Sequence, residues 1–349
     1  MASNDYAVLA GINRYPYLGN LNGPENDVDA FYAWLIDKSG GAVPADPVHI
    51  RLIKSSNFPP AVNAYDEEPT LRALQSGFRA LLALGEASGG KVGRRLFIYL
   101  AGHGFAPNIN EVALYMANAA KGSEGENLGG RMWADFFRGS GFFEEVLLFM
   151  DCCRPLKTKT NVSILPHDAI KGTVARHAYI FAADVSTESR EFPVNGQVRG
   201  VFSLVLMEGL RGAAPRDDTG QLTTETLKDW LRSNVPARAK KFQLDPQKRK
   251  FDAPDDEVIV FSTVAGAGPG VSTTPTVAPV TFHIRVILPP PLAADNVTLI
   301  DGDRAPVAGN KTAPGIWEWD VEAGLYKVSL ASGPSKQIEV PVDPLDVAF

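Results

Sequence analysis

The chain of 349 residues is 45% hydrophobic and 21% charged, which is enough apolar material for the core of an ordinary globular protein. Its formal net charge is −6, with acids and bases interspersed, and this disfavours binding to nucleic acid or anionic lipid. Residues 1–6 lack the pattern of a secretory signal, and no apolar stretch approaches the ~18 residues of a membrane span. We therefore expect a cytoplasmic protein without nucleic-acid or membrane partners.

The two cysteines, Cys152 and Cys153, are adjacent, so they are poorly placed for a disulfide that closes a useful loop. The five histidines are scattered singly, and four clustered ligands of structural zinc are missing. Core packing or reactivity remains as the role of the two thiols.

Short apolar runs and helical periodicities alternate along most of the chain. In order, they predict a strand at 6–12, a helix at 26–38, a strand at 48–53, a helix at 70–87, strands at 95–101, 145–150 and 177–183, helices at 201–210 and 224–234, and a strand at 257–261. Near-continuous apolar runs such as 95–101 are typical of central parallel strands covered on both faces. The pattern predicts one α/β domain, residues 1–263, with a mostly parallel sheet.

Residues 264–279 form an uncharged tract rich in Gly, Pro and Thr, which predicts a linker. Beyond it, short alternating patterns without intervening helices predict strands at 280–288, 297–300, 316–321, 324–331 and 336–342. Residues 280–349 are therefore predicted to be a small all-β sandwich domain. We expect it to be a recognition or positioning module whose partner is a target protein or another copy of the chain.

Candidate catalytic residues follow two of the predicted central strands. His103 stands between two glycines directly after one strand, where an imidazole can act as base or acid near neutral pH. The other strand ends in Asp-Cys-Cys-Arg at 151–154, and a neighbouring cation favours the nucleophilic thiolate. A lone histidine after a strand is more often structural, and a buried cysteine is usually a small hydrophobe. Because the histidine and the cysteines would lie at the same edge of the sheet, the combination favours a cysteine nucleophile with a histidine base.

Six segments occur in an order and strand context typical of one family. They are 7–13 (AVLAGIN), 21–27 (LNGPEND), 101–104 (AGHG), 151–153 (DCC), 200–203 (GVFS) and 254–261 (PDDEVIVF). Over residues 5–262 the chain thereby resembles the caspase-like cysteine peptidases of clan CD, peptidase family C14, and more closely their metacaspase and prokaryotic orthocaspase branch. The resemblance implies a caspase-like three-layer sandwich.

The resemblance also assigns roles. In the family's Asp-x-Cys pattern the nucleophile is the second residue after the acid, here Cys153, while Cys152 holds a variable, structural position. His103 would be the base and acid partner, and the backbone N–H groups of Gly104 and Cys153 would form the oxyanion hole. The implied reaction is acyl transfer to Cys153 followed by hydrolysis of the thioester.

Asp27 and Asp151 match positions where metacaspases place carboxylates that line the primary specificity pocket. Two carboxylates favour a guanidinium or ammonium group, so the resemblance implies cleavage after Arg or Lys. The alternative is that Asp27 caps a helix and Asp151 tethers a neighbouring loop.

The chain departs from the metacaspase pattern after the nucleophile, where residues 154–156 (Arg-Pro-Leu) replace His-Ser-Gly, and Ala101 replaces a common Ser. The family's calcium site has no clear counterpart, because the available acids are dispersed: Asp135, Asp184, Asp217 and Asp218. No metal or other cofactor is predicted, and calcium dependence stays open because the sequence shows no clear site for the ion.

Lys157, Lys159 and Lys171 lie in a polar segment where caspase-like zymogens are nicked, which predicts self-cleavage there. The basic residues of 238–250 are interpreted as a solvated loop face rather than a nucleic-acid site. Two alternatives stay open: an inactive caspase-fold scaffold that acts through its β-domain, and an acyl hydrolase or transferase that uses the same pair on non-peptide substrates.

Overall fold

The computed structural model describes residues 4–120, 125–165, 172–183, 191–194, 196–241, 250–254, 257–263, 281–300, 306–322, 324–340 and 345–348. The chain divides into two compact units, 1–192 with 198–268 and 193–197 with 269–349. The predicted linker, 264–279, lies outside the described residues, so the domain boundaries stay predictions. Within the described part of the chain, no helix has both the length and the apolar character needed to cross a membrane.

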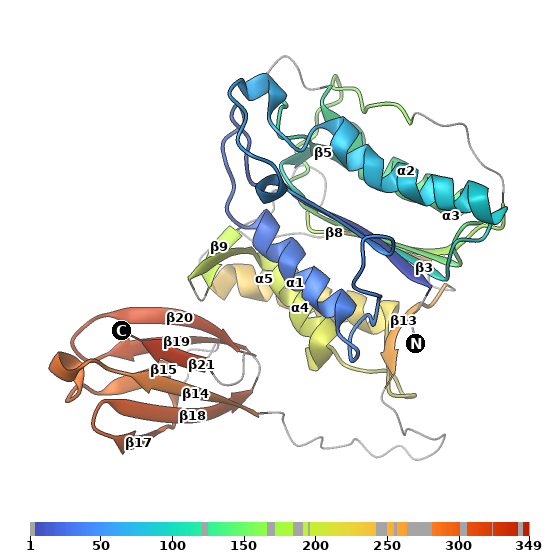
Figure 1. The fold of residues 1–349 in the computed structure, drawn as a ribbon. Coiled ribbons are helices and arrows are strands. Elements are labelled where there is room, and N and C mark those ends of the chain that lie inside the picture. Colours follow the sequence, from blue (N-terminus) through green and yellow to red (C-terminus); the bar gives the residue numbers. More distant parts are fainter. Residues whose placement is uncertain are drawn as a thin grey trace. The chain divides into compact units, whose positions relative to one another are not determined.

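A six-stranded sheet in the order β12-β8-β7-β3-β1-β2 forms the centre of the larger unit (Figure 1). Its strands are β1 (Asp5–Gly11), β2 (Ile50–Lys54), β3 (Arg95–Gly102), β7 (Glu145–Cys152), β8 (Arg176–Phe181) and β12 (Lys250–Asp252). The pairs of β1 with β2 and β3, and of β7 with β3 and β8, are parallel, and β12 is antiparallel to β8. Every residue of β3 and β7 is buried, as their apolar sequences predict.

Helices cover both faces of this sheet (Figure 1). They are α1 (Pro24–Ile36), α2 (Leu71–Ser88), α3 (Gly130–Ser140), α4 (Val201–Glu208) and α5 (Thr224–Lys241). Neighbouring residues of β1 point to opposite faces: Val8 packs in the cluster that contains α2 and α3, and Leu9 in the cluster that contains α1, α4 and α5. The arrangement is the predicted three-layer sandwich with a mostly parallel sheet.

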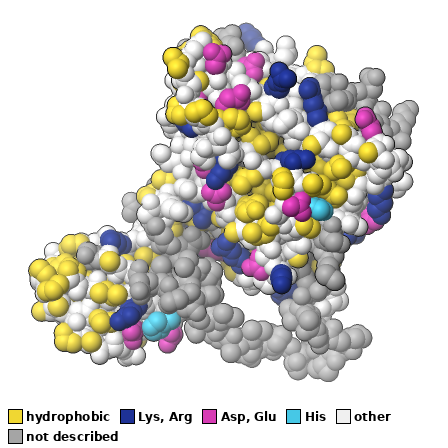
Figure 2. Space-filling view, viewed as in Figure 1, with side chains coloured by type: hydrophobic (Ala, Val, Ile, Leu, Met, Phe, Trp, Pro, Cys, Tyr) yellow, Lys and Arg dark blue, Asp and Glu magenta, His cyan; other side chains and the backbone are white. Residues whose placement is uncertain are grey.

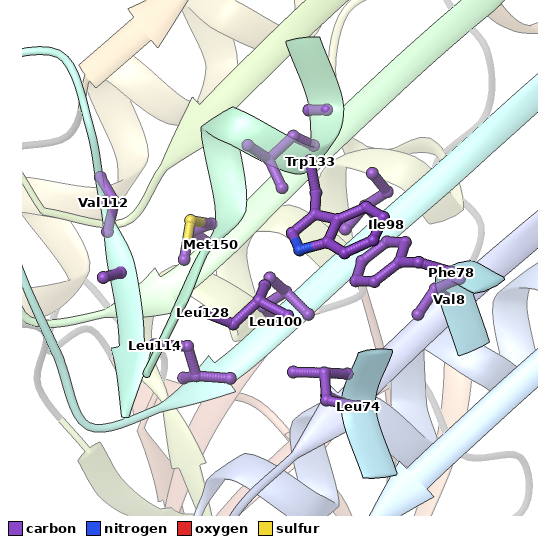
Figure 3. Close-up of a cluster of buried hydrophobic side chains, with 14 of the residues drawn as sticks. Val8, Leu74, Phe78, Ile98, Leu100, Val112, Leu114, Leu128, Trp133 and Met150 are labelled. Carbon is purple, nitrogen blue, oxygen red and sulfur yellow. The ribbon is translucent and has the colours of Figure 1, made fainter. Parts of the chain in front are cut away.

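Figure 3 shows the core beneath α2 and α3. The ring of Phe78 stacks on the indole of Trp133 with centroids 4.6 Å apart, above Val8 and Ile98 of the sheet. Burial of each large apolar side chain contributes about 1.5–3 kcal/mol to folding. Helix α2 ends where Gly89 adopts a left-handed conformation with φ 70°, as its Gly-Gly sequence predicts.

The remaining elements before residue 264 are short. They are β4 (Gly104–Phe105), β5 (Ala113–Tyr115), β6 (Asn127–Gly129), β9 (Glu191–Val194), β10 (Gln197–Gly200), β11 (Gln221–Thr223), β13 (Val260–Thr263), and the single turns Ser55–Asn57, Ala64–Asp66 and Gly209–Ala213. β4, β5 and β6 form one sheet, and β9 pairs with β10.

The structure corrects the sequence reading at the end of this unit. The strand expected at 257–261 begins at Val260 and pairs with β11 outside the main sheet, whose sixth strand is the short β12. In the basic stretch 238–250, residues 238–241 belong to α5, which extends past Pro236, and Arg238 donates two 2.8 Å hydrogen bonds to Glu208. Residues 242–249 lie outside the described residues. Helix α3 was not predicted because its glycine-rich start is typical of a turn.

The smaller unit has two four-stranded sheets, β17-β18-β14-β21 and β16-β15-β19-β20. Its elements are β14 (Thr281–Ile287), β15 (Val297–Ile300), β16 (Pro306–Val307), β17 (Asn310–Ala313), β18 (Ile316–Glu322), β19 (Gly324–Leu330), β20 (Ser335–Val340), β21 (Leu345–Ala348) and the turn Pro290–Leu292. Ile284, Trp319 and Val328, from both sheets, share one buried core. The predicted all-β domain is confirmed, with three short strands, β16, β17 and β21, added.

Candidate active site

Two neighbouring strands deliver His103 and Cys153 to the same edge of the sheet. In the parallel pairing of β3 with β7, Gly102 lies opposite Cys152, so His103 and Cys153 each follow the last paired residue. Both line one cavity of about 70 Å³. Its lining residues are Leu21, Pro24, Asp27, Ala101, Gly102, His103, Asp151, Cys153, Glu191 and Gly200. Four of the sequence-predicted residues, Asp27, His103, Asp151 and Cys153, therefore meet at one place, whereas Gly104 is not among the lining residues. Their catalytic and binding roles stay predictions.

The segment around Tyr15 and Gly19 holds His103. Its ring Nε2 lies 2.9 Å from the carbonyl oxygen of Gly19, and its backbone N–H donates to the Tyr15 hydroxyl at 3.1 Å. A carbonyl only accepts, so Nε2 carries the proton in this hydrogen bond, and in the neutral ring Nδ1 is left as the acceptor. Burial lowers the pKa of His103, and the bond to Gly19 opposes this shift. The site thus favours a neutral imidazole.

The glycines that flank His103 are required by close packing. Gly102 has φ 153°, and an ideal Cβ there would lie 2.3 Å from the Tyr15 hydroxyl oxygen. A Cβ on Gly104 would lie 2.6 Å from Cys152 Sγ and 2.9 Å from the Ala113 carbonyl oxygen. The Gly-His-Gly sequence therefore permits the backbone of this loop to lie directly against β7 and β5.

The two thiols have different surroundings. The side chain of Cys152 is buried in the apolar core, only 1% exposed, and burial raises the pKa of its thiol far above the ordinary range. Cys153 is partly exposed and lines the cavity. Both cysteines are outside any disulfide. Only Cys153 is therefore placed to meet a substrate.

Arg154, which the sequence suggested as a cation favouring the thiolate, is fully buried. Its guanidinium donates to the carbonyl oxygens of Ala183 and Ile109, each at 3.3 Å, and lies 4.9 Å from the ring centroid of Phe181. These contacts join the loop after Cys153 to two neighbouring segments. They give Arg154 an anchoring role.

The two predicted acids meet across Gly200. An ideal Cβ on Gly200 would lie 2.5 Å from Asp151 Oδ2 and 2.9 Å from Asp27 Oδ2. Asp27 is 2% exposed and accepts bonds from Arg199 Nε at 2.6 Å and from the Gly200 N–H at 2.8 Å. Its burial raises the pKa to about 6 despite these partners. Asp27 does not cap α1, since the cap residue is Gly23.

A third carboxylate, Glu191, also lines the cavity and was missed by the sequence reading. Its Oε1 lies 3.3 Å from the Gly23 N–H nitrogen and its Oε2 lies 3.4 Å from that of Asn22, at the start of α1. Burial raises the pKa of Glu191. Nothing in the polar segment that contains it distinguishes this glutamate from its neighbours.

Within the described ranges, no three His, Cys, Asp or Glu side chains gather in a way that could hold a metal ion. Asp135 accepts a hydrogen bond from Tyr179, and Asp217 caps its own turn through Thr219. Asp184 lies outside the described residues. The expectation of no cofactor stays a prediction.

Figure 2 shows acidic and basic side chains interspersed on the visible face of the larger unit.

Comparisons with known proteins agree with the motifs. The family model described as Caspase domain, peptidase C14, matches residues 4–267. Among solved structures, the chain is similar to caspase-1 from Spodoptera frugiperda, with 13% sequence identity and a TM-score of 0.45, over 76% of this chain and 92% of that one. No curated protein sequence matches the chain.

Proposed function

The chain belongs to the caspase-domain family, a family of cysteine peptidases, and on that premise we propose that it is an endopeptidase with Cys153 as nucleophile and His103 as general base and acid. One observation carries the proposal: both residues follow neighbouring parallel strands in register and line the same cavity. The partial exposure of Cys153, beside a buried Cys152, supports the choice of thiol.

The proposed reaction begins when Nδ1 of His103 takes the proton of the Cys153 thiol. The thiolate then attacks the carbonyl carbon of the scissile bond, and the C–N bond breaks as His103 protonates the leaving amine. Water, deprotonated by the same imidazole, hydrolyses the thioester and regenerates the thiol. The carbonyl oxygen of Gly19 holds the ring in place and stabilises its protonated form.

The backbone N–H groups of Gly104 and Cys153 are proposed to stabilise the oxyanion. The strand pairing supports Gly104 in this role. The Tyr115 N–H donates to the carbonyl oxygen of His103, so Gly104 and Leu114 form the next, non-hydrogen-bonded pair of β4 with β5. The N–H of Gly104 therefore points away from β5.

We further propose that the enzyme cleaves after Arg or Lys, the specificity implied by the metacaspase and orthocaspase branch. The support is the charge of the cavity, to which Asp27, Asp151 and Glu191 each contribute a carboxyl group. A substrate guanidinium or ammonium complements such a site, whereas an aspartyl side chain would be repelled.

Self-cleavage is proposed in the segment after the nucleophile. Lys159 is exposed there, whereas the Nζ of Lys157 donates to the Tyr115 hydroxyl at 3.0 Å. Lys171 lies outside the described residues. Wild-type protein is expected to be nicked on storage at Lys159 and Cys153→Ala protein to stay intact. A Cys153→Ala preparation free of other peptidases that is nicked all the same would exclude cleavage by its own site.

Peptide reporters test the function. Wild-type protein and Cys152→Ala are expected to hydrolyse arginyl or lysyl reporters, and Cys153→Ala is expected to lose at least about 10³-fold in kcat/KM. An aspartyl reporter serves as the control for specificity. Equal turnover by wild type and Cys153→Ala would overturn the assignment of the nucleophile, and a folded wild-type protein inactive on every peptide would favour a scaffold.

A further inference from the structure

On the basis of the proposed peptidase function, we propose that Tyr17 and Tyr65 form an aromatic shelf beside His103 that binds apolar side chains of the substrate. The side chains bound there would belong to the second and third residues after the scissile bond. The shelf would thus select the part of the substrate that leaves first, which the cavity beside Cys153 does not hold.

Tyr17 and Tyr65 are exposed and in contact with each other. Tyr17 is 42% exposed and Tyr65 is 55% exposed, and their ring centroids are 4.7 Å apart with the planes inclined by 40°. Among the large apolar side chains exposed in the described ranges, these two are the only aromatic ones. Exposed aromatic rings are typical of binding surfaces, because a rigid ring offers a large contact area at a low cost in conformational entropy.

The turn that carries Tyr17 also holds the imidazole of His103. The N–H groups of Leu18 and Gly19 both donate to the carbonyl oxygen of Tyr15, at 3.2 and 2.9 Å. These bonds place Tyr17 at the tip of the turn, and the carbonyl oxygen of Gly19 lies 2.9 Å from Nε2 of His103. Two residues span at most about 7 Å, so the Cα of Tyr17 lies within that distance of the Cα of Gly19.

An ion pair with a buried carboxylate joins the two turns that carry the tyrosines. Arg14 precedes the first turn, and Glu67 follows the second, Ala64–Asp66. Arg14 Nε donates to Glu67 Oε1 at 2.8 Å, and Glu67 is only 3% exposed. Arg14 Nη2 also donates to the carbonyl oxygen of Phe58 at 2.8 Å. The rings are therefore held together before a substrate binds, which lowers the entropy cost of binding.

A polypeptide substrate has to extend past His103. At about 70 Å³ the cavity is far smaller than the roughly 300–1,000 Å³ of pockets that enclose a whole small molecule, so it accommodates one side chain. In the proposed reaction His103 protonates the leaving amine, and the chain after the scissile bond therefore begins at the imidazole. An extended chain advances about 3.3–3.6 Å per residue, so its second and third residues reach as far as Tyr17 lies from Gly19.

The chemistry of the shelf defines the side chains that it would bind. Ring faces pack against other aromatic rings and against aliphatic side chains, and this contact removes apolar surface of both partners from water. Glycine has no side chain to bury there. The expected substrates therefore carry large apolar residues at the second and third positions after the bond.

The selectivity of the wild-type protein and of single variants tests the inference. Two internally quenched peptides share an arginine before the bond and a glycine directly after it, and they continue with Phe-Phe or with Gly-Gly. Wild-type protein should hydrolyse the Phe-Phe peptide with about tenfold higher kcat/KM, and Tyr17→Ala or Tyr65→Ala should reduce this ratio to within about twofold. Tyr17→Phe and Tyr65→Phe keep the rings and should keep the ratio. Val62→Ala changes an exposed side chain outside the shelf and is the matched control.

The outcomes separate clearly. A wild-type protein without the preference, or a preference that both alanine variants retain, would overturn the inference, as would an equal loss in Val62→Ala. Self-association that depends on Tyr17 and Tyr65, together with an unchanged ratio, would assign the pair to a contact between copies of the chain instead. The preference of the wild-type protein decides if the variants fail to fold. Failure of the proposed function shows separately, because neither peptide is then hydrolysed in a Cys153-dependent way, whereas failure of the shelf leaves both hydrolysed equally well.

Discussion

Replacing either cysteine by alanine leaves a chain with a single thiol, because the sequence contains only Cys152 and Cys153. We expect the two variants to behave oppositely toward a thiol reagent. The Cys153 thiol that remains in Cys152→Ala is partly exposed at the cavity, whereas the Cys152 thiol that remains in Cys153→Ala is 1% exposed. The pair of variants thus isolates the accessibility of each sulfur.

The magnitude follows from burial and ionisation. An ordinary thiol of pKa ~8.5 is about 3% thiolate at pH 7, and burial raises the pKa of Cys152 so that its thiolate fraction is lower still. Gly104 packs so closely against this sulfur that an ideal Cβ on it would lie 2.6 Å from Sγ, so we expect the reagent to reach Cys152 only when the end of β7 separates from Gly104. An opening that costs about 4 kcal/mol slows the reaction about 10³-fold.

The assay is the rate of reaction with a chromogenic aromatic disulfide at pH 7, in native buffer and in guanidinium chloride. Cys152→Ala should react in native buffer at least about 10³-fold faster than Cys153→Ala. In denaturant both variants should release one equivalent at similar rates, which controls for concentration and oxidation. Comparable native rates would refute the claim that β7 and the Gly104 loop seal Cys152.

Three further predictions follow from the same geometry. Gly200→Ala places a methyl group 2.5 Å from Asp151 Oδ2, so it should raise KM for arginyl reporters and lower the free energy of unfolding by about 1–3 kcal/mol. An unchanged KM and an unchanged free energy of unfolding would show that the acids do not lie so close to Gly200. Burial lowers the pKa of His103 below its ordinary 6.5. Because the neutral imidazole is the base, the acid limb of the pH profile of kcat/KM should have its midpoint below pH 6.5, and a midpoint above 6.5 would contradict the assignment. Tyr15→Phe removes the hydroxyl that accepts from His103 and donates to the Tyr115 carbonyl, each at 3.1 Å, so denaturant unfolding should show a loss of about 1–3 kcal/mol, with a lower kcat.

Much of the fold could be predicted because periodicity reports burial. β3 and β7 are buried along their whole length, and this alone produces the continuous apolar runs that the sequence displays. The sixth strand was not predicted from the sequence because β12 has only three residues, Lys-Phe-Asp, and all three are half-buried. It pairs antiparallel with β8 at the edge of the sheet. So short a pairing is set by tertiary contacts and leaves no periodic signal.

The residues of the candidate site likewise fall into those that the sequence pattern could predict and those that it could not. His103 and Cys153 could be found because each directly follows a strong strand pattern, and parallel strands end at the same edge. Glu191 and Arg199 lie in the paired strands β9 and β10, far along the chain, and they contact Gly23 and Asp27 at the start of α1 only in the folded protein. A single sequence gives no spacing rule that would connect them.

The charges of the site explain why its acids can stand at the end of an apolar sheet. Burial alone disfavours ionised Asp27, and its pKa is raised to about 6 even with Arg199 and the Gly200 N–H as partners. Without that guanidinium, two neighbouring buried carboxylates would repel each other, and one would be held as the neutral acid. Arg199 thus permits Asp27 to ionise near neutral pH beside Asp151.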